Sequence, residues 1–233
     1  ENSTINVTPV PDTLPYIEDF DAGLPASWDT AINGNGAQWT YMTDAALGST
    51  TGSDGYMSID DEAAGPGGIT NADLISNGID LSNSTGQIML EFEHHYDYFV
   101  NDSATVFISI DGGISWQQLN SYSSDQGSMA TPDVASYNIK AIAAGEPDVK
   151  IKWNYNDGGN MVKSWSLDDV KIYDKSHADI LEYNIPTQYS SYINYMDTTV
   201  YVYVPVGTDL ANLTADFTLS PGAAAYVGGT QQV

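Results

Sequence analysis

The 233-residue sequence contains neither cysteine nor arginine, and six lysines are its only strongly basic residues. Without cysteine the chain has no disulfide framework and no thiolate to act as nucleophile or metal ligand. Its 31 acidic residues give a formal net charge of −25. Such a charge repels nucleic acids and anionic membranes and attracts divalent cations. We therefore exclude nucleic-acid binding, and we note that a bacterial surface protein can do without disulfides.

Long hydrophobic runs are also missing. No apolar stretch approaches the ~20 residues that span a bilayer, so we expect no direct membrane insertion. No signal peptide is visible, and the polar start at Glu1 is what we expect of a processed or trimmed protein. A composition that is 42% hydrophobic and 11% aromatic is nevertheless sufficient for a packed core.

The apolar pattern that is present has the period of β-strands. Residues 87–98 and 104–110 alternate between apolar and polar positions, as do residues 149–155, and such alternation is typical of half-buried antiparallel strands. The Asp111-Gly112-Gly113 segment predicts a hairpin turn between two strands. No helical period extends over ten residues. The sequence therefore predicts an all-β protein.

Composition divides the chain into four segments. We expect an extended leader over residues 1–15, which contains three prolines, and a β-sandwich over residues 16–174. A short linker, residues 175–178, precedes a second β module over residues 179–233. An immunoglobulin-like sandwich needs ~7 strands. The second module offers only three, so we expect it to be incomplete.

The segment Ser164–Asp174 predicts the closing strand of the sandwich. Strict alternation puts Asp168 on the same face as Val170 and Ile172, which must face a core. A buried carboxylate needs a counter-charge, and protein cations are scarce here. Calcium prefers oxygen ligands, and we therefore predict a calcium ion near Asp168.

Three motifs in this order carry a family resemblance. Asp19-Phe20-Asp21 followed by Leu24-Pro25 and Trp28 resembles the opening of bacterial cleaved-adhesin and choice-of-anchor domains, which are relatives of the MAM jelly roll. The segment 74–81 resembles their "L-x-S-P-x-I-D-L" strand, although Asn77 replaces the usual proline. The segment 167–172 resembles their closing "L/I-D-D/N-V-x-I" strand.

The resemblance implies a jelly-roll β-sandwich whose first and last strands meet at a calcium site. The candidate ligands are acids that adjoin apolar strand positions: Glu18, Asp21, Asp60, Asp61 and Asp168. The resemblance to cleaved-adhesin domains also implies a non-catalytic role in adhesion.

The second module resembles the repeated immunoglobulin-like domains of secreted Bacteroidota proteins, through the segments 204–210 and 217–223. Proteins of this layout commonly leave the cell by type IX secretion. In that lineage Asp-Ser/Thr before a small or apolar residue resembles an O-glycosylation acceptor, and the matching positions are Thr13, Thr30, Ser103 and Thr198.

Several sharper interpretations have simpler alternatives. The segment 109–116 fits the Asp-box of sialidase propellers, but it occurs once, so we favour a tight turn in which Asp111 bonds backbone amides. His94 has the parity of buried residues, which favours a hydrogen-bonded core histidine over a zinc ligand. Trp39 and Trp116 could stack on sugar rings, although such aromatics more often pack in cores.

We thus predict a non-catalytic, calcium-stabilised adhesion or binding module of a secreted or cell-surface bacterial protein. Its partner would be a protein or a glycan at a surface, and the chain would be part of a larger multidomain protein. The alternative is a carbohydrate-binding accessory module of a secreted polysaccharide-degrading enzyme or protease.

Overall fold

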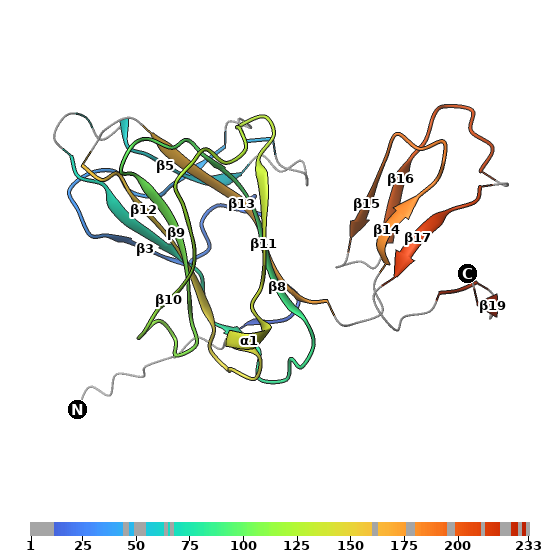
Figure 1. The fold of residues 1–233 in the computed structure, drawn as a ribbon, viewed down its shortest axis with the longest axis horizontal. Coiled ribbons are helices and arrows are strands. Elements are labelled where there is room, and N and C mark those ends of the chain that lie inside the picture. Colours follow the sequence, from blue (N-terminus) through green and yellow to red (C-terminus); the bar gives the residue numbers. More distant parts are fainter. Residues whose placement is uncertain are drawn as a thin grey trace. The chain divides into compact units, whose positions relative to one another are not determined.

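The structure is a computed structural model that forms two compact units, residues 1–173 and 174–233 (Figure 1). It describes residues 12–43, 47–48, 55–62, 65, 68–159, 163–175, 180–194, 199–210, 213–219, 225–227 and 230–231. The boundary between the units lies next to the expected end of the sandwich at residue 174. The regular secondary structure of the described residues is almost entirely β-strand, which confirms the predicted all-β class.

Unit 1 is a sandwich of two mainly antiparallel sheets. The first sheet has the strand order β11-β8-β13-β5-β4, and β2 pairs with β13. Its strands are β2 (Tyr16–Glu18), β4 (Thr40–Met42), β5 (Tyr56–Asp60), β8 (Ile88–Tyr96), β11 (Asp133–Asn138) and β13 (Ser164–Asp174).

The second sheet of unit 1 has the order β10-β9-β12-β6-β3. Its strands are β3 (Asp29–Ile32), β6 (Asn71–Ile75), β9 (Ser103–Ser109), β10 (Gln117–Tyr122) and β12 (Lys150–Asn156). A single turn of helix, α1 (Lys140–Ala143), lies close to β8. A short parallel pair joins β1 (Asp12–Thr13) to β7 (Ile79–Asp80), so the described end of the expected leader is bound to the sandwich.

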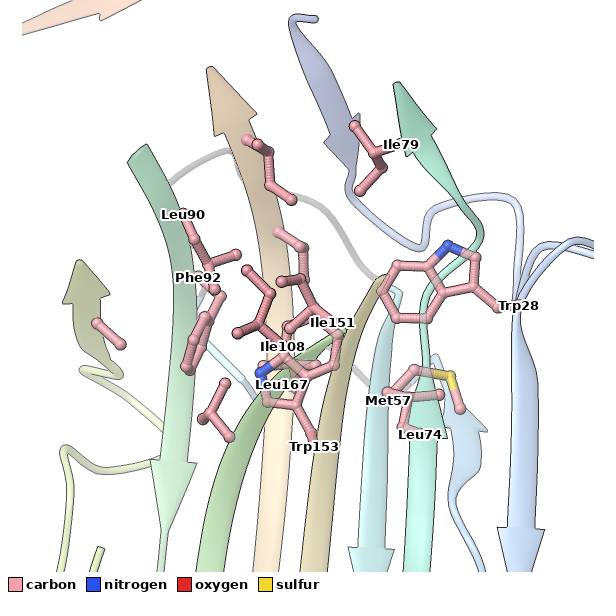
Figure 2. Close-up of a cluster of buried hydrophobic side chains, with 14 of the residues drawn as sticks. Trp28, Met57, Leu74, Ile79, Leu90, Phe92, Ile108, Ile151, Trp153 and Leu167 are labelled. Atoms are coloured by element: carbon pink, nitrogen blue, oxygen red, sulfur yellow. The ribbon is translucent and has the colours of Figure 1, made fainter. Parts of the chain in front are cut away.

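The core lies between the two sheets. In Figure 2 the side chains of Phe92 from one sheet and Trp153 from the other meet in this layer, and their rings form an edge-to-face pair with centroids 5.6 Å apart. The Trp28 ring stacks on that of Trp153 in the same cluster. The alternation predicted for residues 88–96 is confirmed, because every even position of β8 is buried. Burial of large apolar and aromatic side chains is the main stabilising term of such a sandwich.

Strand β13 departs from the strict alternation that we expected. Trp165 and Leu167 are fully buried in the same core cluster as Val170 and Ile172, although these two pairs have opposite parity. The change of phase falls at Asp169, whose φ of 51° lies in the left-handed region. A residue in that conformation is typical of a β-bulge. The strict alternation expected for Ser164–Asp174 was therefore wrong, and it does not place Asp168 on the face of Val170 and Ile172.

The described residues of unit 2 form three two-stranded antiparallel sheets. They pair β14 (Ile180–Asn184) with β17 (Asp216–Leu219), β15 (Ser190–Asn194) with β16 (Thr199–Tyr203), and β18 (Tyr226–Val227) with β19 (Thr230–Gln231). Ser191 Oγ donates a hydrogen bond to the Tyr183 carbonyl at 2.7 Å, and this bond links the β15 hairpin to β14. The immunoglobulin-like interpretation of this unit stays a prediction.

Candidate functional site

The middle of β13 buries two adjacent carboxylates. Asp168 and Asp169 are each only 1% exposed, and the next residue, Val170, pairs with Glu18 of β2. Asp168 Oδ1 accepts a hydrogen bond from the Asp169 amide at 2.8 Å. Lys171 Nζ lies 3.9 Å from Asp169 Oδ1. The structure therefore brings Glu18 and Asp168 to the same strand junction, as the predicted calcium site requires.

Glu18 is partly buried at this junction. Its Oε1 accepts a hydrogen bond from the Phe20 amide at 2.9 Å, and burial raises the pKa of its carboxyl group above the usual value. The oxygen ligands of Glu18 and Asp168 suit calcium chemically. Among the residues that the structure describes, however, no three histidine or acidic side chains form a group that could hold a metal ion. Backbone carbonyls and water, which calcium also accepts, would have to complete a site built on these two residues.

The other predicted ligands lie elsewhere or face solvent. Asp21 is exposed, and its amide donates a hydrogen bond to Asp19 Oδ1 at 3.1 Å. Asp60 is exposed and pairs with Ser164. Because a strand rises about 3.3 Å per residue, Asp60 lies about 13 Å along β13 from Asp168. One ion therefore cannot bind both Asp60 and Asp168.

Asp61 belongs to a second group of buried carboxylates at the ends of strands from both sheets. It is 0% exposed and accepts a hydrogen bond from Thr70 Oγ1. The Thr70 amide donates to Asp157 Oδ2 at 2.9 Å, and the Gly159 amide donates to Asp157 Oδ1 at 2.7 Å. Thr70 therefore bridges two buried carboxylates. Asp61 follows a strand of the first sheet, and Asp157 follows a strand of the second.

Asp102 is the third member of this buried carboxylate group. Its Oδ2 accepts a hydrogen bond from the Tyr155 hydroxyl at 3.3 Å, while Oδ1 and Asp61 Oδ2 are buried without a hydrogen-bond partner. Burial raises the pKa of Asp102 to about 6, and the charges of Asp157 and Asp61 add to the effect. Burial likewise raises the pKa of Asp61. The group can therefore hold a proton in mildly acidic solution.

A lysine between two aromatic rings marks the outer face of the second sheet. Lys152 Nζ lies 4.7 Å from the ring centroid of Trp116 and 4.8 Å from that of Phe107. It also lies 3.8 Å from Asp73 Oδ2, and Asn154 Nδ2 donates a hydrogen bond to Asp73 Oδ1 at 2.7 Å. We call these five residues the lysine–aromatic patch. It combines two aromatic rings with charged and polar groups.

Trp39 has a different environment from Trp116. It is 4% exposed, its ring packs 5.6 Å from that of Trp165, and its Nε1 lies 3.4 Å from the Ala72 carbonyl that accepts its hydrogen bond. The structure thus places Trp39 in the core and removes it from the exposed candidates for ligand binding. Trp116 remains.

Two of the simpler alternatives are confirmed. His94 is buried, and its Nδ1 accepts a hydrogen bond from Trp165 Nε1 at 3.2 Å. Burial lowers its pKa to about 4, so it is a neutral core histidine.

Asp111 caps its own turn, because its Oδ1 accepts a hydrogen bond from the Ser115 amide at 2.9 Å. Hydrogen bonds from Ser115 lower the pKa of Asp111 to about 2.

The positions predicted for O-glycosylation differ in accessibility. Thr13 and Thr30 are exposed, whereas Ser103 is half-buried in β9. Thr198 lies outside the described residues. Modification at the first three stays a prediction.

Comparison with known proteins identifies the fold of unit 1. The K1 cleaved adhesin domain of Lys-gingipain from Porphyromonas gingivalis W83 matches with a TM-score of 0.53 and 20% identity, over 69% of this chain and 98% of that domain. The module TmCBM61, solved with beta-1,4-galactotriose, matches at 12% identity over 67% of this chain and 94% of its own, with a TM-score of 0.47. CBM27-1 of Caldicellulosiruptor saccharolyticus, solved with mannohexaose, matches at 18% identity over 68% and 96%, with a TM-score of 0.44. The predicted resemblance to cleaved adhesin domains is confirmed for the fold.

Sequence comparison adds a result for unit 2. The family model described as "SGBP, N-terminal" matches residues 180–231. No curated protein matches the chain. Within the described residues, no helix has the length and apolar character needed to cross a bilayer.

The sequence-based prediction missed Thr70, Asp102 and Asp157. Asp102 and Asp157 each adjoin an apolar strand, which is the same signal that selected Asp61. What the sequence does not show is that these strand ends meet at one place.

Proposed function

We propose that the chain is a non-catalytic binding module of a secreted or cell-surface bacterial protein, and that its sandwich attaches that protein to another protein or to a glycan. The observation that carries this proposal is the match of unit 1 to nearly the whole K1 cleaved adhesin domain. Type IX secretion, glycosylation and a place in a larger multidomain chain belong to the same proposal.

Calcium is the second element of the proposal. A calcium ion near Glu18 and Asp168 would join β2 to β13 and offset the charge of Asp168 and Asp169, which are almost fully buried. An ion that binds only the folded protein stabilises it by about 2.7 kcal/mol when its free concentration is one hundred times the dissociation constant.

Binding to intact cells tests the adhesion proposal. We would add the fluorescently labelled full chain to animal cells with and without protease treatment of the cell surface, in calcium and in chelator. The proposal predicts saturable binding that requires calcium, and a loss after protease treatment identifies a protein partner. The absence of saturable binding to any cell surface would contradict it.

A second candidate function, carbohydrate binding by unit 1, is favoured by the lysine–aromatic patch. Trp116 presents a ring beside Lys152 and the Asp73–Asn154 pair, and such polar groups can orient a sugar. Replacement of Trp116 by alanine should abolish binding to an immobilised polysaccharide. Ile114→Ala is the matched control, because Ile114 is 88% exposed only two residues away. Equal binding by both variants would exclude the patch.

A further inference from the structure

Lys150 is an unpaired lysine beside the lysine–aromatic patch. It lies two residues before Lys152 on β12, so both side chains point to the outer face of the second sheet. Among the residues that the structure describes, the ion pairs of lysine are those of Lys152, Lys163 and Lys171. The ammonium group of Lys150 makes neither an ion pair nor a hydrogen bond with a described residue, although the chain has 31 acidic residues and only six lysines. It is therefore available to an anion.

The acid that lies closest to Lys150 in sequence packs against a turn instead. Asp148 lies two residues before Lys150, and its Oδ2 is 2.6 Å from the place that a Cβ on Gly112 would occupy. The Gly112 amide donates a hydrogen bond to the Asp148 carbonyl at 3.1 Å. The Asp148 carboxylate is thus held at the turn between β9 and β10, and it does not neutralise Lys150.

The same turn brings Lys150 close to Trp116. A Cβ on Gly113 would lie 3.4 Å from Trp116 Cζ2 and 3.8 Å from Lys150 Cδ. The φ of Gly113 is 97°, a conformation that glycine adopts at no steric cost. Trp116 and Lys150 are both half-buried, and Lys152 Nζ lies 4.7 Å from the centroid of the Trp116 ring. The Trp116 ring therefore has two lysine side chains as neighbours.

The two lysines differ in what they can bind. Lys152 is already held by Asp73 at 3.8 Å and by the rings of Phe107 and Trp116. Lys150 has no such partner, so its ammonium group can donate a hydrogen bond to an anionic group that lies beside the Trp116 ring. A hydrogen bond between an ammonium group and a carboxylate is about twice as strong as one between neutral groups.

We propose that Lys150 and the lysine–aromatic patch bind an acidic sugar, whose ring stacks on Trp116 and whose carboxylate accepts a hydrogen bond from Lys150. The C–H groups of a sugar ring pack favourably on the face of an aromatic ring. The net charge of −25 repels a densely charged polymer, so the ligand that fits carries isolated carboxylates, as a uronic acid side group or a terminal acidic sugar does. This proposal rests on the carbohydrate binding proposed for unit 1 and names its class of ligand.

Isothermal titration of the full chain provides the test. Two pairs of ligands differ in an acidic sugar: a xylan with and without glucuronic acid side groups, and sialyllactose against lactose. The variants are Lys150→Gln, which removes the charge and keeps most of the stem, Lys150→Arg, which keeps the charge, and Trp116→Ala. Lys140→Gln is the matched control, because Lys140 is exposed on α1 and the net charge changes equally. Melting curves would show that each variant is folded.

We expect the acidic member of at least one pair to bind more tightly than its neutral counterpart, and that pair identifies the source of the carboxylate. Lys150→Gln should weaken binding of the acidic member at least about tenfold, the effect of losing a hydrogen bond to a charged group, and leave the neutral member unchanged. Lys150→Arg and Lys140→Gln should keep the preference. Trp116→Ala should weaken binding of both members.

Three results would overturn the proposal: neutral members that bind as tightly as acidic ones, a preference that survives in Lys150→Gln, or no binding of any acidic sugar. Equal binding of both members that is lost in Trp116→Ala would refute the acidic ligand and leave the carbohydrate function of unit 1 intact. Binding of an acidic sugar that is unchanged in Trp116→Ala would contradict both the patch and the role of Lys150.

Discussion

Trp28 stacks on Trp153 with ring centroids 5.6 Å apart and an interplanar angle of 9°. Trp28 ends the opening motif of the sandwich, and Trp153 lies at the centre of β12. The Trp28 indole also donates a hydrogen bond to the Tyr16 hydroxyl at 2.7 Å. This pair therefore connects the segment of the opening motif to the middle of the core.

The stack predicts a large effect of replacing Trp28 by alanine. Removal of a buried tryptophan leaves a cavity and typically costs about 3–5 kcal/mol. Urea unfolding followed by tryptophan fluorescence would measure this, because all five tryptophans lie in unit 1. Trp116→Ala is the control, since its ring lies on the outer face of the sheet. A loss for Trp28→Ala no greater than that for Trp116→Ala would contradict the packing described.

How far the sequence could predict this structure depended on the environment of each strand. The inner strands β8, β9 and β12 were predicted because one face of each is buried, which imposes alternation. The hairpin turn predicted at residues 111–113 is confirmed, because β9 pairs with β10. The strand β11 was missed, since it lies at a sheet edge with mostly polar, exposed residues. The bulge at Asp169 left no signal, because a left-handed aspartate cannot be distinguished by composition from an extended one.

The candidate sites show the same limit. The pairing of β2, which carries Glu18, with β13, which carries Asp168, agrees with the resemblance, which implies that the first and last strands meet. Asp61 was predicted as a calcium ligand, which stays a prediction; its neighbours in the buried group, Asp102 and Asp157, come from strands 40 or more residues away in sequence. Only the tertiary arrangement of strand ends brings them together.

Asp102 should make the sandwich more stable in mild acid than it would otherwise be. Its pKa is raised to about 6, against about 3.9 in an unfolded chain. Between these values the folded protein holds a proton that the unfolded chain has lost, so this contribution falls as the pH rises from about 4 through 6. The total effect is on the order of 2 kcal/mol.

The substitution Asp102→Asn isolates this effect. At pH 7.5 in chelator the variant should be more stable than the native chain, and the difference should shrink at pH 4.5. The comparison between variants is necessary because His94 also changes the stability with pH, in the opposite direction. Its pKa is lowered to about 4, so the stability that neutral His94 contributes is lost as the pH falls from about 6.5 to 4. A difference that does not change with pH would refute the assignment.

The left-handed conformation of Asp169 predicts a clear order among substitutions. With φ at 51°, a β-branched residue is strained by about 1–3 kcal/mol. Asp169→Asn keeps a side chain that tolerates this region, so Asp169→Val should lower the melting temperature well below that of Asp169→Asn. Equal melting temperatures for the two variants would mean that β13 has no left-handed residue here.

The calcium site of unit 1 is the central claim, and thermal unfolding of the full chain with calcium and with chelator measures it most directly. Three proteins are needed: the native chain, Asp168→Asn, and Asp60→Asn, which alters an exposed acid about 13 Å from Asp168 along β13. We predict that calcium raises the melting temperature of the native chain and of Asp60→Asn, but not of Asp168→Asn. No shift in the native chain, or an undiminished shift in Asp168→Asn, would contradict a calcium ion at the junction of β2 and β13.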